Sequence, residues 1–254
     1  MLGAISGDII GSAYERHSIK TKKFELFSKY SEFTDDTVMT IAIVNAILND
    51  EKYLEHVIEF GKRYADVGYG ASFRKWLNSW NHKPYNSWGN GSAMRVSAIG
   101  FLFETEEEVL FEAKKSAEIT HDHAEGIKGA EATALAIFMA RKGKSKNQIR
   151  EKISKQFDYD LSRTVDEIRP NYKFQVSCQE SVPESIICFL DADSYEDTIR
   201  NAISLGGDAD TMACIAGGIA EAYYGAIPSE ILVEVYKRLP KEFLEIVLRF
   251  RDRV

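Results

Sequence analysis

The stretch from Leu205 to Ala220 places two acids and a hydroxyl, those of Asp208, Asp210 and Thr211, just before a run that is apolar or small on every side. Such a run is typical of a helix buried all round rather than of an amphipathic surface helix. Carboxylates at the N-terminus of a buried helix destabilise the fold unless a partner compensates their charge. The N–H groups and dipole of the helix N-terminus compensate part of it, and a bound hard cation would compensate more.

A second stretch repeats this arrangement. Thr34, Asp35, Asp36 and Thr37 precede an apolar run that ends near Leu48. Because buried helices of one small domain must pack on each other, we expect the two acid-bearing N-termini to meet. The resulting all-oxygen cluster suits Mg²⁺, Mn²⁺ or Ca²⁺ rather than zinc. Aspartate and threonine also cap ordinary helices, but a cap needs one such residue and each of these sites supplies three or four.

The first thirteen residues are apolar and rich in glycine. Gly3, Gly7 and Gly11 recur every fourth residue, which places them on one face of a helix. Another backbone can approach that face closely because no side chain stands in the way. The acids of this segment are Asp8 and Glu15.

Composition excludes several classes of protein. The 254 residues carry a formal charge of −7 and contain no basic tract with interleaved aromatics, so we expect no general nucleic-acid-binding surface. Three cysteines without CxxC spacing argue against a disulfide framework and for buried thiols in a reducing compartment. No apolar run reaches the roughly 20 residues of a membrane span, and the N-terminus lacks the basic region of a signal peptide. We therefore expect a cytoplasmic protein, and a monomer.

Helical periodicity and helix-start signals recur along the chain. Helices are predicted to begin at the capping boxes 105–108 and 145–148, at Ser181 and Ser194, and at two prolines, and one is predicted over about 92–103. The polar residues 16–33 are expected to form a loop that covers the site. Only 172–176 alternates like a strand, and no linker or repeat divides the chain. We predict an all-α fold in a single compact domain, residues 1–254, with about a dozen helices around two buried ones.

Three further stretches carry candidate functional residues. The Gly-Asn-Gly-Ser turn at 89–92 enters a helix, which suits a phosphate or diphosphate. His121 and His123 could suggest zinc, but no cysteine or third histidine supports that, and a histidine that contacts a ligand is the better interpretation. Glu15 is either a solvated surface acid or, near a metal pair, a general acid or base.

Taken together, these motifs resemble the ADP-ribosylglycohydrolase family, which includes the dinitrogenase reductase-activating glycohydrolases and the ADP-ribosyl-arginine and ADP-ribosyl-serine hydrolases. The resemblance runs through nearly the whole chain, and 177–183 is similar to the short bacterial branch. The stretches that carry it are 3–8 with Glu15, 34–37, 68–70, 89–95, 120–121 and 205–211.

The resemblance implies an all-α fold that holds two Mg²⁺ or Mn²⁺ ions. The implied metal ligands are Thr34, Asp35, Asp36, Asp208, Asp210 and Thr211. The implied substrate-binding residues are Gly89, Asn90, Gly91, Ser92 and Met94, for the diphosphate and the adjacent ribose, and His121, near the adenosine. The implied catalytic residues are Glu15, Asp35 and Asp208.

We therefore expect metal-dependent hydrolysis of the glycosidic bond between ADP-ribose and an N- or O-linked acceptor. The substrate would be an ADP-ribosylated protein or small-molecule conjugate, and ADP-ribose would be released. One alternative is a metal-dependent nucleotide phosphohydrolase, which would use the same aspartates but yield AMP. Another is a protein that holds ADP-ribose without turnover, against which the complete set of acids argues.

Overall fold

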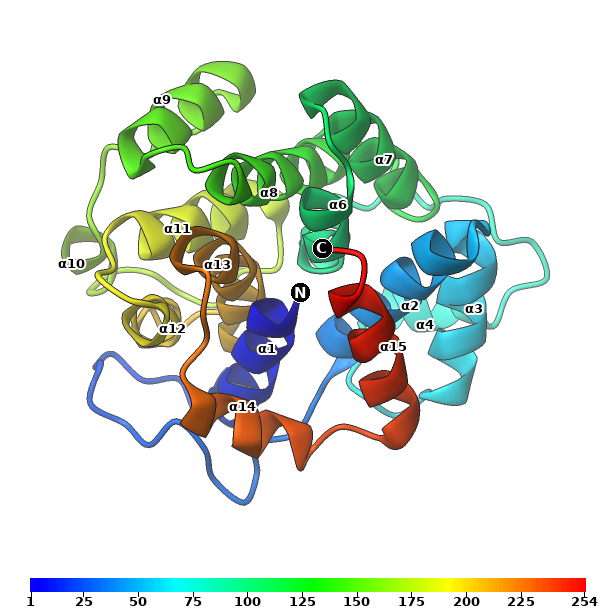
Figure 1. Cartoon of the computed structure of the whole chain (residues 1–254), viewed down its shortest axis with the longest axis horizontal. Coiled ribbons are helices and arrows are strands. Elements are labelled where there is room, and N and C mark those ends of the chain that lie inside the picture. The colour runs from blue at the N-terminus through cyan, green and yellow to red at the C-terminus, as the bar shows by residue number, and fades with distance from the viewer.

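The computed structural model describes all of residues 1–254 and consists of fifteen helices joined by turns and loops (Figure 1). In chain order they are α1 (Leu2–Glu15), α2 (Asp35–Asn49), α3 (Tyr53–Arg63), α4 (Ala71–Leu77), α5 (Gly91–Met94), α6 (Ser97–Leu102), α7 (Glu106–Glu118), α8 (Ala124–Arg141), α9 (Lys146–Phe157), α10 (Val165–Ile168), α11 (Cys178–Leu190), α12 (Tyr195–Ser204), α13 (Ala209–Tyr224), α14 (Ser229–Tyr236) and α15 (Lys241–Arg251).

The first helix lies directly against α13, near the centre of the view in Figure 1. Each glycine of the predicted face meets backbone: a Cβ on Gly3, Gly7 or Gly11 would overlap the carbonyl oxygen of Gly217, Ala213 or Ala209 respectively. The prediction that another backbone approaches this face is therefore confirmed. Since successive glycines of α1 match successive turns of α13, the two helices stay in close contact along most of α1.

One hydrophobic core of 71 buried residues draws on every part of the chain, from Met1 to Phe250. The predicted all-α, single-domain fold is confirmed. Helices outnumber the predicted dozen because α5 and α10 are single turns of four residues, too short to show a hydrophobic period. None of the helices combines the length and the apolar character needed to cross a lipid bilayer.

Most predicted helix starts are confirmed. Both capping boxes form, with Thr105 and Ser145 as N-caps, and the Ser194 side chain accepts a hydrogen bond from the N–H of Asp197. Pro228 and Pro240 immediately precede α14 and α15. These starts were predictable because a local hydrogen bond or a fixed φ angle sets each of them.

Two predicted helix limits differ from the structure, in both cases because of long-range contacts. α11 begins at Cys178 instead of Ser181, and the Cys178 N–H donates to the carbonyl of Trp88 at 2.9 Å. The helix predicted over 92–103 is interrupted after Met94. The interruption allows the Arg95 side chain to reach the carbonyl oxygen of Ser116.

Loop 16–33 does not cover the predicted site. Arg200 of α12 holds it by donating to the carbonyls of Lys22 and Phe24, both at 2.9 Å, and Lys20 donates to the carbonyl of Leu205. No residue of 16–33 lines the cavity whose wall includes Asp208 and His121. The loop therefore packs against α12 and the turn before α13.

The strand-like stretch 172–176 forms no strand. Its last residue accepts one hydrogen bond from the N–H of Asn90 at 2.8 Å, and the next residue forms a single bridge with Gly89. An isolated bridge is too little pairing for a sheet, but it places this segment beside the 89–92 turn.

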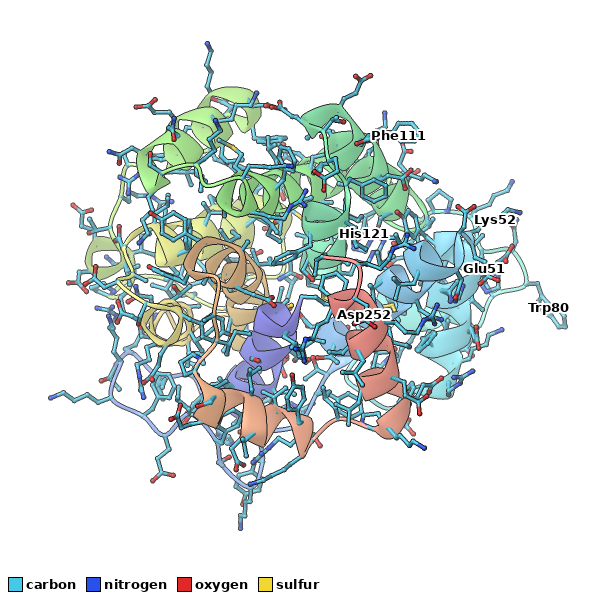
Figure 2. The ribbon with its side chains drawn as sticks, in the orientation of Figure 1. Glu51, Lys52, Trp80, Phe111, His121 and Asp252 are labelled. Carbon is cyan, nitrogen blue, oxygen red and sulfur yellow. The ribbon has the colours of Figure 1, made fainter.

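The loop between α4 and α5 carries two exposed tryptophans with different surroundings. Trp80 projects away from the body of the molecule (Figure 2) and is fully exposed. Trp88 is about half exposed and lines the same cavity as Asp208 and His121.

We predict that Gly7→Ala destabilises the protein by about 1–3 kcal/mol, the usual cost of overpacking. Alanine ordinarily favours a helix over glycine by up to about 1 kcal/mol, but here its methyl group would also lie 2.8 Å from the N atom of Cys214. Urea unfolding measures the difference. Gly70→Ala is the control because a Cβ there meets nothing within 4 Å. A Gly7→Ala protein as stable as the wild type would contradict the close approach.

Candidate active site

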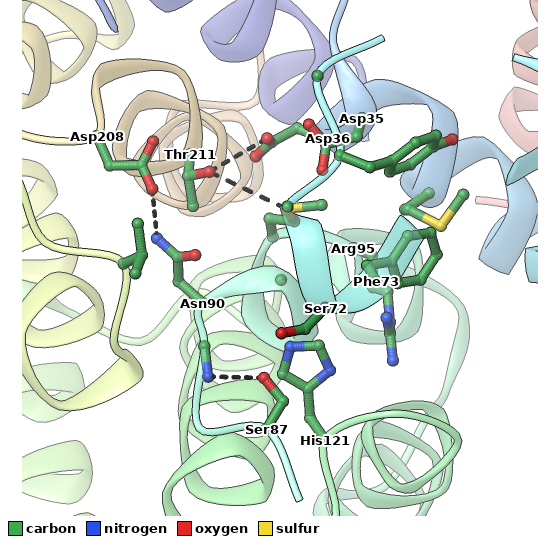
Figure 3. Close-up of a pocket in the computed structure, with 18 of the residues that line it drawn as sticks. Asp35, Asp36, Ser72, Phe73, Ser87, Asn90, Arg95, His121, Asp208 and Thr211 are labelled. Atoms are coloured by element: carbon green, nitrogen blue, oxygen red, sulfur yellow. Dashed lines mark hydrogen bonds between the residues drawn. The ribbon is translucent and has the colours of Figure 1, made fainter. Parts of the chain in front are cut away.

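The N-termini of α2 and α13 meet, as predicted from their acid-rich openings. The Thr211 hydroxyl of α13 donates to Asp36 Oδ2 of α2 at 3.1 Å (Figure 3). Asp208 is the N-cap residue of α13, and Asp210 lies in its first turn. The close packing of α1 on α13 adds the acids of α1 to the same place.

Two groups of three carboxylates lie at this junction. The first consists of Asp8, Asp36 and Asp210, and the second of Glu15, Asp208 and Asp210; within each group, one oxygen per residue lies within 4.8 Å of the others. Asp210 belongs to both groups. The two groups therefore meet at one shared carboxylate, and each has the acids that could hold a metal ion.

Asp8 is the member of this cluster that sequence reasoning did not select. Its carboxylate accepts hydrogen bonds from the N–H groups of Thr34 and Thr37, at 3.0 and 3.1 Å, and from both of their hydroxyls. Asp8 thus caps α2 from a neighbouring helix. The available signal was an acid inside a helix that is otherwise apolar all round.

The other predicted ligands occupy different positions around the cluster. The Thr34 side chain accepts from the Asp36 N–H as the N-cap of α2 and donates to Asp8 at 2.6 Å. Asp35 is half-buried, lines the cavity and belongs to neither three-carboxylate group. Glu15 is half-buried at the cavity wall.

Burial raises the pKa of every one of these acids. It raises the pKa of Asp8 to about 6, against the effect of the hydrogen bonds from Thr34 and Thr37. Burial, followed by repulsion from Asp8 and Asp208, raises the pKa of Asp35 to about 8. The pKa values of Asp36 and Asp210 are raised well above their ordinary range by burial and by neighbouring acids. In the absence of a cation, ionisation of these acids is therefore unfavourable.

The residues of the cluster fit a hard divalent cation. Their partners within the chain are hydroxyl, amide and backbone N–H groups rather than cationic side chains. Asp36 Oδ1 is fully buried and has no hydrogen-bond partner at all. A buried carboxylate oxygen without a partner is rare in folded proteins, and the donor set of carboxylates and hydroxyls is the one that Mg²⁺ and Mn²⁺ prefer.

A cavity of about 430 Å³ opens from the acid cluster and ends at His121 (Figure 3). Its size lies within the range of pockets that hold nucleotide-sized ligands. Asn90 joins its two ends, because its side-chain amide donates to Asp208 Oδ2 at 2.7 Å while its neighbours Gly89 and Gly91 lie beside His121. Apart from Ser92 and Thr34, the residues of the predicted phosphate turn and the predicted metal ligands therefore line one cavity.

Five of the six predicted binding residues line the cavity: Gly89, Asn90, Gly91, Met94 and His121. Ser92 is fully buried, and its hydroxyl donates to the carbonyl of Gly126 at 2.7 Å, so its side chain holds α5 against α8.

The two histidines of the 121–123 stretch do not form a metal site. His123 is the N-cap of α8 and accepts from the N–H of Glu125 at 3.1 Å. His121 turns into the cavity instead. The interpretation of His121 as a ligand-contacting residue is therefore the one that the geometry favours over zinc.

Aromatic side chains form much of the remaining cavity wall, and the sequence analysis assigned a binding role to none of them. They are Tyr69, Phe73, Tyr85, Trp88 and Phe174. They come from three separate segments, so no local spacing reveals them. Such flat apolar surfaces suit a purine base, which binds proteins by stacking.

Fold and site together define an all-α protein whose acid cluster opens into a nucleotide-sized cavity. The sequence model of the ADP-ribosylglycohydrolase family matches residues 1–253 of this chain. The chain therefore belongs to the ADP-ribosylglycohydrolase family, and it is an enzyme of the glycohydrolase type.

Individual relatives agree with this assignment. The chain is similar to the ADP-ribosylhydrolase ARH3 of Homo sapiens, with 30% identity over an alignment of 310 positions. The alignment covers 89% of this chain and 84% of that protein. It is also similar to the ADP-ribosyl-[dinitrogen reductase] glycohydrolase of Rhodospirillum rubrum, with 24% identity covering 95% and 90%. A solved structure titled ADP-ribosylglycohydrolase-related protein complex shares the fold, with a TM-score of 0.77, 23% identity and 99% and 95% coverage.

We predict that Asp210→Asn stabilises the metal-free protein by about 1 kcal/mol, because it removes one of several mutually repelling buried charges. Asparagine keeps the oxygen that accepts from the Thr211 N–H at 2.9 Å. The measurement is thermal unfolding in EDTA at mildly alkaline pH, and again with Mn²⁺.

In the same assay Mn²⁺ should raise the melting temperature of the wild type, because it binds only the folded state, and should raise that of Asp210→Asn much less. Asp252→Asn, at an exposed acid that does not line the cavity, is the control and should behave like the wild type. A destabilised Asp210→Asn protein that responds fully to Mn²⁺ would contradict the assignment.

Proposed function

We propose that this protein hydrolyses the glycosidic bond between ADP-ribose and an N- or O-linked acceptor and releases ADP-ribose. The observation that carries the proposal is the single cavity that joins the buried acid cluster to the 89–91 turn and His121, with Asn90 bridging the two ends. Substrates would be an ADP-ribosylated protein or a small-molecule conjugate.

The acid cluster would hold two divalent cations. Asp210 is the central ligand, with Asp8 and Asp36 on one side and Asp208 and Glu15 on the other. We keep Thr34, Asp35 and Thr211 in the proposed set, because each lies in or next to the hydrogen-bonded network of the cluster. Two Mg²⁺ or Mn²⁺ ions bound there would orient the ribose hydroxyls and a water molecule and lower the pKa of that water.

The chain's own side chains supply the remaining chemistry. Cleavage of a glycosidic bond develops positive charge on the sugar, and the surrounding carboxylates stabilise that charge. Glu15 lies beside Asp208 at the cavity wall, where its side chain can accept a proton from the attacking water as a carboxylate, or donate one to the leaving acceptor as a carboxylic acid. Asp208 is held in place by the Asn90 amide.

The far end of the cavity would bind the rest of ADP-ribose. Gly89 and Gly91 expose backbone where a diphosphate can approach, and His121 faces the same space. The aromatic wall provides a surface for the adenine. Binding energy gained here, away from the reacting bond, holds the ribose in position for cleavage.

We expect the wild type to release ADP-ribose from an arginine-ADP-ribosylated protein or a serine-ADP-ribosylated peptide with Mg²⁺ or Mn²⁺, and not with EDTA. Asp208→Ala and Asp35→Asn should each lower turnover by at least 100-fold, roughly the loss when a catalytic electrostatic contact is removed. Chromatographic detection of released ADP-ribose is the measurement, and Asp252→Asn, at an exposed acid outside the cavity lining, is the control.

Release of AMP would contradict glycosidic cleavage and favour a nucleotide phosphohydrolase. ADP-ribose that binds tightly but is never released from any conjugate would favour a binding protein.

We predict that Trp88→Ala weakens ADP-ribose binding about 5- to 100-fold, the range of base–aromatic stacking. The fold should be unaffected, because Trp88 is half exposed. Isothermal titration calorimetry with ADP-ribose measures the change. Trp80→Ala is a matched control: it removes a fully exposed tryptophan of the same loop that does not line the cavity. Equal affinities of the two variants would contradict the role of the aromatic wall.

A further inference from the structure

Arg95 is a fully buried arginine at the edge of the cavity. Its Nη2 group donates to the carbonyl of Ser116 at 2.6 Å and to the hydroxyl of Thr120 at 3.0 Å. Ser116 belongs to the last turn of α7, where carbonyls lack helical partners. Burial lowers the pKa of Arg95 to about 10, so the side chain remains a cation near neutral pH. It can therefore only donate to Thr120.

The hydroxyl of Thr120 has a second neighbour, Nδ1 of His121, at 2.7 Å. A hydroxyl has one proton and two lone pairs. Since Arg95 occupies a lone pair, the proton of Thr120 is free to point at Nδ1. If Nδ1 carried the proton instead, the hydroxyl proton would have no acceptor, and Thr120 is completely buried. A buried donor without an acceptor destabilises the folded protein.

We propose that Arg95 and Thr120 form a hydrogen-bond relay that fixes His121 as the tautomer with its proton on Nε2. The relay makes His121 a permanent N–H donor beside the 89–91 turn, at the end of the cavity away from the acid cluster. Arg95 and Thr120 are positioning residues, since both act through His121. The inference rests on the proposed function for the identity of the ligand, but the tautomer is a property of the free protein.

The surroundings of Nε2 indicate what it would bind. A Cβ on Gly91 would lie 3.3 Å from Nε2 and one on Gly89 3.5 Å, so the nitrogen faces the glycine turn. Burial and the positive charge of Arg95 lower the pKa of His121 well below its usual range, which keeps the ring neutral. The ring of Tyr85 packs on His121 with 5.9 Å between centroids. A neutral, immobile N–H donor suits an acceptor oxygen of a diphosphate or of a ribose hydroxyl.

The test uses the chain of 254 residues and its Thr120 variants, because Arg95 is too deeply buried to remove safely. Nitrogen NMR of histidine-labelled protein shows which ring nitrogen carries the proton, with His121→Gln to assign the signal. We expect a single Nε2–H tautomer in the wild type and in Thr120→Ser, which keeps the hydroxyl. Thr120→Val should lose this single tautomer and bind ADP-ribose about tenfold more weakly, as expected for the loss of one good hydrogen bond to a charged group.

Thr133→Val is the matched control. Thr133 is equally buried, but its hydroxyl has no partner, so this variant should keep the tautomer and the affinity. In turnover assays Thr120→Val should raise KM more than it lowers kcat, whereas a general loss of structure would lower both stability and kcat.

Two results would overturn the relay: an Nδ1–H tautomer in the wild type, or a Thr120→Val protein with unchanged tautomer and affinity. A wild type that binds no ADP-ribose but shows the Nε2–H tautomer would refute the proposed function and support the relay as a structural feature. The two proposals can therefore fail separately.

Discussion

The contact of α1 with α13, backbone against backbone, is the constraint on which the rest of the structure depends. Glycines at positions 3, 7 and 11 let α1 lie on α13 with no side chain between them. The contact carries Asp8 and Glu15 to the first turn of α13, where Asp208 and Asp210 already stand. The acid cluster is therefore built by core packing rather than by surface loops, and core packing is the least mobile part of a protein.

The acid cluster places several mutually repelling carboxylates at the position where a divalent cation would neutralise their charge. Threonine hydroxyls, backbone N–H groups and the Asn90 amide satisfy part of the hydrogen-bonding capacity of the acids. One oxygen of Asp36 remains without a partner. Proteins tolerate such local costs mainly where function requires them. The same site opens into a cavity with neutral donors and aromatic surfaces, so the charged and the apolar halves of one ligand could be bound together.

Sequence reasoning reached the parts of this structure that depend on local patterns. Apolar runs that begin with aspartates predicted that the N-termini of α2 and α13 meet. The glycine spacing predicted that another backbone, which is that of α13, approaches α1 closely. Asp8 was missed because its partners, Thr34 and Thr37, are 26 and 29 residues away in the chain. Arg95 meets Thr120 across 25 residues, and loop 16–33 follows contacts with Arg200 that no local pattern encodes. Long-range hydrogen bonds, rather than local propensities, set the positions of Asp8, Arg95 and this loop.

The most direct test of the account is diffraction from crystals grown with Mn²⁺ at a wavelength where manganese scatters anomalously. The account predicts two anomalous peaks at the junction of α2 and α13, both within ligand distance of Asp210, and neither peak in crystals of Asp210→Asn. One peak should lie beside Asp36 and the other beside Asp208. Crystals of the folded wild type with no peak at this junction, or with manganese bound only at surface acids, would contradict the claim that the meeting of these helices forms a divalent cation site.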